Sequence, residues 1–419
     1  MFSKPKQTLI AVQLSTSQIS PRSSPSCNSN KPVGNDGIAR RLDTSPTRKR
    51  VYSRWRGDTL AWASGLLLDK LPMAGSIRGP RLRGESTSVK LGLSIKSSAT
   101  KVPAVKTVDV ASKLKMPAIG LGTWKMDDGV ATGAVKTALN VGYKHIDCAA
   151  IYLNEHEVGE AFSSWFGQGG KRDDLWITSK LWNDCHQTEH VEAALKKSLS
   201  DLQIDELDLY LIHWPIAQKH GVLRVQSGDD FIPINQVPIS DTWQAMEDCV
   251  KKGLCKSIGV SNFSQSKLQP LLDNATIKPA VNQVEAHPFF PQDELLDFCR
   301  RNDIAFTGYS PLGSGDRPDR MRADADPNLF EDETIKSLAA ERNISPGQVI
   351  LAWAVNRGTV PIPKSSNESR LKENLAAAEI EFSPEEMARI AEANQNYRFV
   401  HGRFWEMEGG PYLAEEIWA

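Results

Sequence analysis

The sequence has 419 residues, of which 40% are hydrophobic and 24% are charged. This composition is typical of a folded globular protein and excludes a largely disordered chain. The formal charge of −1 hides two unlike segments, because residues 1–107 carry 19 Lys and Arg against 5 Asp and Glu, whereas the remainder carries 31 against 46. The acidic remainder argues against nucleic acid as a partner, and no apolar run approaches the roughly 20 residues that span a membrane.

Residues 1–104 form a basic segment rich in Ser, Pro, Arg and Lys, without regular spacing of apolar residues. Such a segment cannot bury enough apolar surface to offset its chain entropy, so we predict a disordered extension before a folded domain at residues 105–419. Three interpretations stay open: an organellar transit peptide, a basic tail, or sequence translated upstream of a start at Met73. The third is preferred because the segment contains no recognisable module. The six cysteines form no CxxC pair, which is typical of a reducing compartment, so we expect the cytosol.

Eight short runs that are typical of strands follow one another along the folded domain. They cover residues 118–122, 143–148, 175–180, 207–213, 257–260, 280–285, 305–310 and 360–363. Amphipathic segments separate them; residues 191–199, for example, place apolar side chains at positions i, i+4 and i+8. Eight strands alternating with helices predict an α/β fold, the closed (β/α)8 or TIM barrel. An open dinucleotide-binding sheet is disfavoured, because no GxGxxG follows a strand.

Two stretches exceed a minimal barrel, namely residues 215–238 and the tail after Asn394. We expect both to cover the mouth of the barrel, where the strands' C-terminal ends open, and to determine substrate specificity. In the tail, His401, Arg403 and Trp405 are candidates to reach the substrate pocket.

Ionisable side chains end three consecutive predicted strands. Asp147 ends the second strand and is followed by Tyr152, Lys180 ends the third, and His213 ends the fourth. A phenol has a pKa of about 10, so Tyr152 needs a nearby ammonium to serve as an acid near neutral pH. Lys180 could supply that charge, with Asp147 holding Lys180 in turn. With His213 as a hydrogen-bond donor, this set suits protonation of the alkoxide that forms as a carbonyl is reduced.

Five motifs, which include Asp147, Tyr152 and His213, resemble, in order, those of the aldo-keto reductase family. They are GYKHIDCAAIYLNEHEVG (142–159), LIHWP (211–215), GVSNF (259–263), NQVEAHP (282–288) and IPKS (362–365). The resemblance runs from about residue 108 to the end and is greatest to the aldehyde and aldose reductase branch. It implies NADPH-dependent reduction of aldehydes or aldoses, with Tyr152 as the general acid, Lys180 and Asp147 lowering its pKa, and His213 orienting the carbonyl. It also implies a substrate pocket lined by Trp124, Trp182 and Trp214.

The resemblance further implies which residues bind the cofactor. The residues implied to bind the nicotinamide are Tyr309, which stacks on the ring, and Ser261, Asn262 and Gln283, which bind its carboxamide. Those implied to cover the pyrophosphate are Ser310, Leu312 and Ser314, and those implied to contact the adenine are Glu373 and Asn374. Independently, Lys364 at the end of the last strand, with Ser365 and Arg370 at the start of the next helix, suits the 2′-phosphate of NADP. We therefore predict NADPH rather than NADH.

Alternatives to a general aldehyde reductase stay open. One is a xylose reductase-like enzyme of narrower specificity, and another is a redox-sensing NADP(H)-binding regulatory subunit. We expect a monomer whose partner is a small aldehyde or sugar. His186 and His190 are spaced like a pair of metal ligands, but no third ligand accompanies them, so we interpret them as surface residues and predict no metal site.

Overall fold

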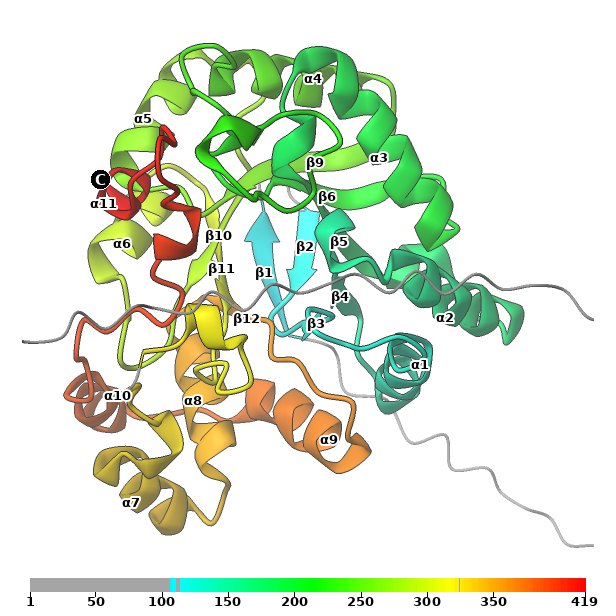
Figure 1. The fold of residues 1–419 in the computed structure, drawn as a ribbon. Helices are drawn as coiled ribbons and strands as arrows, with labels where there is room; N and C mark the ends of the chain where they lie inside the picture. The colour runs from blue at the N-terminus through cyan, green and yellow to red at the C-terminus, as the bar shows by residue number, and fades with distance from the viewer. Residues whose placement is uncertain (1–105, 111–113, 324) are drawn as a thin grey trace, which may run out of the picture. The chain divides into compact units, whose positions relative to one another are not determined.

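The computed structural model describes residues 106–110, 114–323 and 325–419, so the predictions for residues 1–104 lie outside the described residues. The described chain begins with an antiparallel hairpin of β1 (Thr107–Val110) and β2 (Leu114–Pro117), which was not predicted from the sequence. Val110 and Met116 of this hairpin pack against residues near the starts of the barrel strands, among them Trp176 and Val281. The hairpin therefore closes the N-terminal end of the barrel, and Figure 1 shows it across the centre of the ring.

The predicted barrel is confirmed. Its parallel strands neighbour one another in chain order, and they are β3 (Leu121–Gly122), β4 (His145–Asp147), β5 (Trp176–Leu181), β6 (Leu207–Ile212), β9 (Cys255–Ser261), β10 (Val281–Glu285), β11 (Ala305–Tyr309) and β12 (Val360–Pro361). The first and last strands meet through Gly120 N, which donates to Pro361 O at 3.0 Å, and Gly122 N, which donates to Pro363 O at 3.1 Å. These two hydrogen bonds close the sheet, as a barrel requires.

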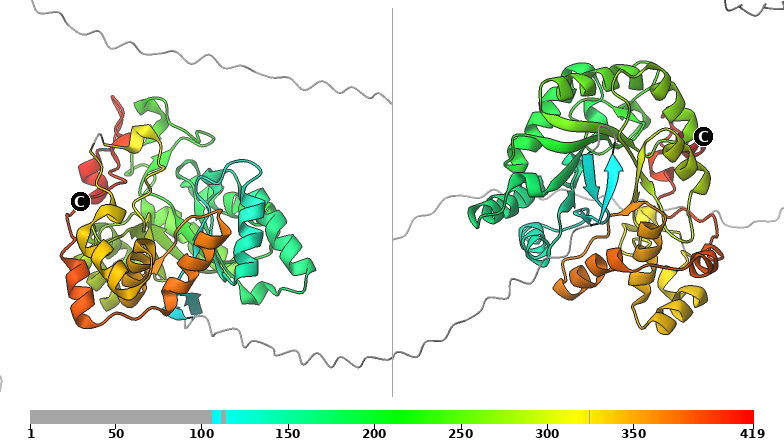
Figure 2. Two further views of the ribbon diagram at one scale, coloured as in Figure 1. Left: turned by 90° about the horizontal axis from the view of Figure 1, so that it is seen from below. Right: turned by 180° about the vertical axis from the view of Figure 1, so that it is seen from behind.

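Helices surround the strands (Figure 2). They are α1 (Ala131–Val141), α2 (Glu155–Gly167), α3 (Thr188–Leu202), α4 (Ile239–Lys251), α5 (Gln265–Asn274), α6 (Asp293–Arg301), α7 (Glu333–Arg342), α8 (Pro346–Asn356), α9 (Glu368–Ala376), α10 (Pro384–Ala391) and α11 (Ala414–Trp418). In α3 the predicted apolar stripe, including Val191, Leu195 and Leu199, is buried in the core. Among the described residues, no helix combines the length and apolar character needed to cross a membrane.

Local sequence explains where several helices begin and how closely they pack. Ser345 and Ser383 each form a capping box at the start of α8 and α10, satisfying backbone N–H groups that have no partner within the helix. Gly159 lets α2 approach α3, because a Cβ at this position would lie 2.1 Å from Asp201 O. This glycine belongs to the motif of residues 142–159, so part of that motif serves packing.

Both stretches predicted to cover the barrel mouth do so. Residues 215–238 contain a short antiparallel pair, β7 (Ala217–Gln218) and β8 (Phe231–Ile232). One apolar cluster joins this insertion to the tail and to the strand ends, through side chains such as Phe231, Trp405 and Trp214. The tail therefore forms part of the wall around the mouth.

Candidate active site

The four ionisable residues predicted to act together lie at neighbouring strand ends. Asp147 is the last residue of β4, Lys180 lies near the end of β5, and His213 directly follows β6. Tyr152 ends a short 3₁₀ turn, Ala150–Tyr152, and the residue after it, Leu153, has a left-handed φ of 60°. The turn brings the tyrosine back towards the strand ends, where it meets residues at the ends of three neighbouring strands.

Lys180 is the centre of this group. Its Nζ donates to Asp147 Oδ1 at 2.5 Å, to Cys148 O at 2.8 Å and to Tyr152 Oη at 3.4 Å. Gln283 Nε2 donates to the other Asp147 oxygen at 2.7 Å. The lysine side chain is fully buried, so its position is set by these acceptors and solvent does not screen its charge.

The charges set the protonation states of this group. Burial disfavours a charge on Lys180, but the adjacent Asp147 carboxylate outweighs burial and raises the pKa of the ammonium. Burial raises the pKa of Tyr152 to about 12, against the opposing pull of Lys180. Lys180 lowers the pKa of Tyr152, as expected, but Asp147 raises it, and desolvation of the phenolate exceeds the attraction of the ammonium, so the pKa lies above its usual value. The phenol is accordingly held protonated, which is the form that donates a proton.

His213 packs against the ring of Tyr152. The two rings meet edge to face with centroids 5.8 Å apart, and Trp182 meets the imidazole in the same way at 5.1 Å. Burial, reinforced by the charge of Lys180, holds the pKa of His213 well below its usual value, so the imidazole is neutral. A neutral imidazole can donate one hydrogen bond to a carbonyl without competing with Tyr152 as an acid.

The residues expected to hold the nicotinamide form one hydrogen-bonded set at the ends of β9, β10 and β11. Tyr309 Oη donates to Asn262 Oδ1 at 2.7 Å, and Ser261 Oγ donates to Gln283 O at 2.7 Å. Asn262 Nδ2 also donates to His213 O at 2.9 Å, which connects this set to the four ionisable residues. Asn262 has a left-handed φ of 66°, a backbone conformation that is typical of functional sites in non-glycine residues.

The loop after β11, which is expected to cover the pyrophosphate, also contains non-glycine residues with positive φ. Ser310 and Ser314 have positive φ values of 49° and 43°, and Ser314 Oγ donates to Ser310 Oγ at 2.9 Å. Leu312 is partly buried against the apolar clusters behind the loop. The loop is therefore a tight turn whose hydroxyl groups lie close together.

Two residues that the sequence did not single out, Lys125 and Asp316, lie next to Lys364. Lys125 Nζ donates to Asp316 Oδ1 at 2.5 Å, and Lys364 Nζ donates to Asp316 Oδ2 at 3.3 Å. Although burial opposes it, the pKa of Asp316 is lowered by these lysines, and the carboxylate bridges the loop after β3 to the end of β12. No sequence signal pairs Lys125 with Asp316, because 191 residues separate them.

The residues expected to bind a 2′-phosphate lie at and just before the start of α9. Asn367 caps the helix, with its Oδ1 accepting from Arg370 N at 3.0 Å, and Ser365 is buried beside it. The Arg370 side chain is exposed and makes no ion pair with any other described residue. Glu373 and Asn374 lie on the same helix, Glu373 accepting a hydrogen bond from Ser369 and Asn374 buried.

An aromatic wall stands beside Tyr152 and His213. Trp182 and Trp214, both buried, contact Trp405 of the tail with ring centroids 5.8 and 5.6 Å apart. Trp124 lies at the edge of the same cluster. Trp182 Nε1 donates to Leu223 O at 3.0 Å, which ties this wall to the insertion of residues 215–238.

The tail residues expected near the pocket behave differently from one another. Trp405 is part of the aromatic wall, whereas the Arg403 side chain is exposed. His401 is partly buried, its Nδ1 accepts from Arg403 N, and its carbonyl accepts from Trp418 Nε1 at 2.9 Å. Of the three, Trp405 is the residue that contacts the predicted pocket tryptophans.

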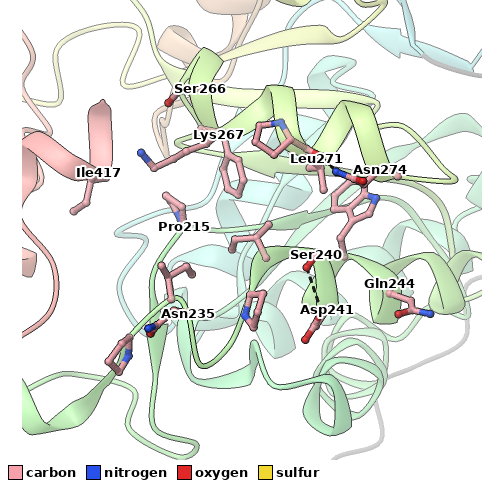
Figure 3. Close-up of a pocket in the computed structure, with 18 of the residues that line it drawn as sticks. Pro215, Asn235, Ser240, Asp241, Gln244, Ser266, Lys267, Leu271, Asn274 and Ile417 are labelled. Atoms are coloured by element: carbon pink, nitrogen blue, oxygen red, sulfur yellow. Dashed lines mark hydrogen bonds between the residues drawn. The ribbon is translucent and has the colours of Figure 1, made fainter. Parts of the chain in front are cut away.

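A separate groove of about 900 Å³ lies beside the mouth (Figure 3). Residues of α4, α5 and the tail line it, and Lys267 of α5 extends towards Ile417 of the tail (Figure 3). None of the four ionisable residues lines this groove. The volume therefore belongs to a surface outside the candidate active site.

The prediction that His186 and His190 are both surface residues is wrong for His186. His186 is 1% exposed, and neither of its ring nitrogens has a hydrogen-bond partner among the described residues. It precedes α3, whereas His190 lies in the first turn of this helix, so they do not share a helical face. His190 instead stacks on His220, with ring centroids 3.6 Å apart.

Comparisons with known proteins match the folded part of the chain. A model of the Aldo/keto reductase family matches residues 118–395. An aldo/keto reductase of Synechocystis sp. is 48% identical over 322 residues, covering 77% of this chain and 98% of that protein. Aldo-keto reductase family 1 member A1 of Gallus gallus is 47% identical over 290 residues, covering 68% and 88%. Among solved structures, the aldose reductase from Schistosoma japonicum aligns with a TM-score of 0.66 at 36% identity, covering 73% of this chain and 96% of that one.

Proposed function

Because the chain belongs to the aldo-keto reductase family and is therefore an oxidoreductase of aldehydes, we propose that it reduces aldehydes, aldoses among them, to alcohols with NADPH. In reverse, it would oxidise alditols with NADP⁺. One observation carries the proposal: the buried ammonium of Lys180 lies 3.4 Å from the phenol oxygen of Tyr152 while it is paired with Asp147. This arrangement stabilises the phenolate at the moment when Tyr152 loses its proton.

The residues around this group fit a nicotinamide dinucleotide. Ser261, Asn262 and Gln283 bring hydroxyl and amide groups together beside the Tyr309 ring, as recognition of a flat carboxamide-bearing ring requires. Arg370 lies in the first turn of α9, and Lys364 lies a few residues before this helix. When bound, the dihydronicotinamide supplies a hydride, which no protein side chain can supply.

Two side chains of this protein act on the substrate carbonyl. The protonated phenol of Tyr152 donates its proton to the carbonyl oxygen, and the charge left on the phenol oxygen is stabilised by the ammonium of Lys180. Neutral His213 donates a hydrogen bond to the same oxygen and fixes the direction of the carbonyl. The aromatic wall of Trp182, Trp214 and Trp405 excludes water from this point. All of these groups come from one chain, so we propose that a monomer is active.

Tyr152→Phe tests this chemistry directly. The variant keeps the ring but removes the proton donor, and we expect kcat for a simple aldehyde to fall by about 10²–10⁴-fold, the contribution typical of general acid catalysis. Binding of NADPH, followed by quenching of tryptophan fluorescence, should be unchanged. Turnover of Tyr152→Phe within tenfold of the parent enzyme would reject Tyr152 as the acid. A parent rate no higher than that of Tyr152→Phe would instead favour the regulatory subunit.

The preference for NADPH rests on the start of α9. A charge-assisted hydrogen bond contributes about 1.5–3 kcal/mol, so Arg370→Ala should raise the KM for NADPH by about 10–100-fold and leave the KM for NADH unchanged. Lys372→Ala is a matched control, because Lys372 lies on the same helix, is exposed, and pairs with Glu368. An unchanged KM for NADPH in Arg370→Ala would contradict the assignment.

Substrate class is tested with a panel of aldoses, glucuronate and aromatic aldehydes, followed through the absorbance of NADPH. A general aldehyde reductase should turn over all three groups, since the wall contributed by the tail is mainly aromatic. Activity confined to pentoses would support the narrower, xylose reductase-like enzyme.

A further inference from the structure

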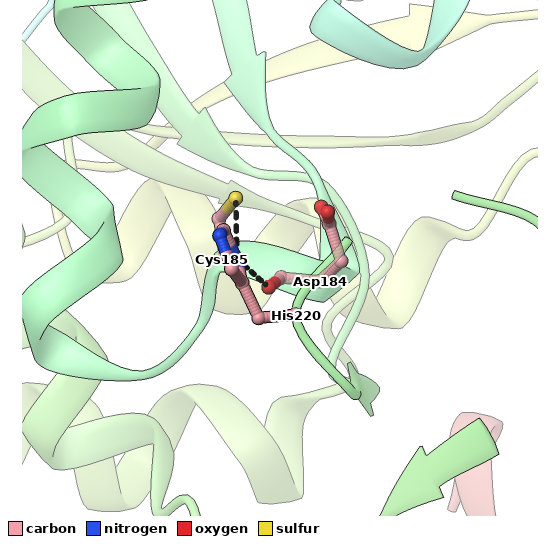
Figure 4. A group of neighbouring side chains, drawn as sticks. All are labelled: Asp184, Cys185 and His220. Atoms are coloured by element: carbon pink, nitrogen blue, oxygen red, sulfur yellow. Dashed lines mark hydrogen bonds between the residues drawn. The ribbon is translucent and has the colours of Figure 1, made fainter. Parts of the chain in front are cut away.

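A second cluster of ligating side chains lies outside the candidate active site, where two connections at the barrel mouth meet. Asp184 and Cys185 belong to the short turn after β5, Asn183–Cys185, and His220 follows β7 in the insertion of residues 215–238. A carboxylate oxygen of Asp184, the sulfur of Cys185 and a ring nitrogen of His220 all lie within 4.8 Å of one another. Figure 4 shows Cys185 and His220 facing each other beside Asp184.

The separation of sulfur and nitrogen is close to that of a metal site. Cys185 Sγ lies 3.9 Å from His220 Nδ1. In a tetrahedral zinc site, bonds of about 2.3 Å to sulfur and about 2.0 Å to nitrogen place these two atoms about 3.5 Å apart. A shift of a few tenths of an ångström therefore brings the pair to ligating distance.

Neighbouring contacts hold the three residues in this arrangement. The Asp184 carboxylate is buried and accepts from Gly221 N at 3.2 Å, which fixes the backbone next to His220. Although His220 is exposed, its ring stacks on His190 with centroids 3.6 Å apart and planes 10° apart. Two connections far apart in the sequence are thus already joined at this point, so a bound cation would require little loop ordering.

We propose that Asp184, Cys185 and His220 form a binding site for a divalent cation of the zinc type. One thiolate and one carboxylate balance the charge of the cation, and one neutral imidazole completes a set of sulfur, oxygen and nitrogen ligands that zinc prefers. Without a cation, His220 Nδ1 donates a hydrogen bond to the backbone carbonyl of Asp184 at 3.1 Å, and it also faces Cys185. Binding therefore moves the His220 proton from Nδ1 to Nε2, which frees Nδ1 to ligate the cation. Water fills the remaining position of the tetrahedron.

Binding is a ligand exchange without oxidation or reduction. Before a cation binds, burial and the neighbouring Asp184 raise the pKa of the Cys185 thiol to about 12, so the sulfur carries a proton. Formation of the metal–sulfur bond breaks the S–H bond and releases that proton to solvent, as metal coordination of thiols generally does. The protonated thiol is a poor nucleophile, which separates this site from a redox-sensing cysteine.

The position of the site connects it to the substrate pocket. Asp184 follows closely after Trp182, whose Nε1 donates to Leu223 O in the same insertion that carries His220. A bound cation would therefore hold the insertion against the aromatic wall at a second point, in addition to the hydrogen bond from Trp182 to Leu223. If the proposed function holds, occupancy should change the KM for bulky aldehydes more than kcat.

The test is cation binding by the full-length protein without an affinity tag, stripped of metals with a chelator. Titration with Co²⁺ should give one equivalent with a thiolate-to-cobalt charge-transfer band, which Zn²⁺ then displaces. Cys185→Ser should abolish the band, and His220→Ala should weaken Co²⁺ binding by at least about 100-fold, since even loss of an outer contact costs about 10–100-fold. His156→Ala is the matched control, because His156 is exposed and distant in sequence, and it should bind as the parent does.

Each result has a defined meaning. His220 is exposed, so we expect its replacement to leave the core intact, and an unchanged urea unfolding curve for His220→Ala separates loss of a ligand from unfolding. Absence of the charge-transfer band in the parent protein would overturn the proposal, as would equal Co²⁺ affinity in the parent, Cys185→Ser and His220→Ala. Because binding is read spectroscopically, this outcome is independent of whether the enzyme reduces aldehydes.

Discussion

Removing the ammonium of Lys180 should destabilise the fold as well as stop turnover. In Lys180→Met the carboxylate of Asp147 stays buried, with a side chain only 2% exposed. Its remaining side-chain hydrogen bond among the described residues comes from Gln283. Breaking a buried ion pair by removing one partner typically lowers the free energy of unfolding by about 3–5 kcal/mol.

The buried carboxylate can limit this cost by taking up a proton. The reference pKa of an aspartic acid is about 3.9, and each pH unit above this value adds about 1.4 kcal/mol to the cost of protonating the side chain. Protonation at pH 7 therefore costs about 4 kcal/mol. The loss in Lys180→Met should therefore be about 4 kcal/mol at pH 7 and about 2 kcal/mol at pH 5.5. The loss of stability is smaller at lower pH because the folded variant binds a proton that the unfolded chain does not bind, so lower pH favours the folded state.

Urea unfolding followed by tryptophan fluorescence measures this difference for the parent and the variant at both pH values. The double variant Asp147→Asn/Lys180→Met is the control, because it has no buried carboxylate, and it should be more stable than Lys180→Met at pH 7 without the added pH dependence. A loss below about 1 kcal/mol in Lys180→Met, or one that is equal at both pH values, would refute the account of Lys180 as the charge partner of a buried Asp147.

Three further predictions concern pH, specificity and packing. Burial lowers the pKa of His145 to about 4, so the folded protein excludes a proton that the unfolded chain binds below about pH 6.5. Between pH 7 and pH 5 the free energy of unfolding should therefore fall by about 2 kcal/mol more in the parent than in His145→Asn. Equal decreases in the two proteins would contradict this. Trp405→Ala should raise the KM for aromatic aldehydes in steady-state assays, whereas Trp405→Phe should keep this KM within a few-fold, because the phenyl ring preserves the contact with Trp182. Similar KM values in both variants would argue against Trp405 as part of the aromatic wall. Gly159→Ala should lower the free energy of unfolding by about 1–3 kcal/mol in thermal unfolding, because the added methyl meets the backbone of α3. Gly167→Ala should not, because the added methyl there meets nothing within 4 Å. Equal effects would show that α2 can shift.

The sequence by itself determined the elements that depend on local signals. Alternating apolar runs and amphipathic segments located all eight strands within a few residues, because strand and helix periodicity is a local property. Asp147, Lys180 and His213 were found for the same reason, since polar residues that end buried parallel strands must lie at one end of a barrel. The hairpin of β1 and β2 was missed, because its strands are short and its role comes from the barrel end that it covers.

Tertiary structure decided what depends on burial and on contacts between distant segments. The pKa of Tyr152 is raised because desolvation outweighs Lys180, and no sequence pattern reports how deeply a phenol is buried. The same holds for the pairing of Lys125 with Asp316, the contact of Trp405 with Trp182, and the approach of His220 to Cys185. Chain order gives the residues that reach the mouth of the barrel, whereas the folding of its loops decides which of them touch and what charge each one carries.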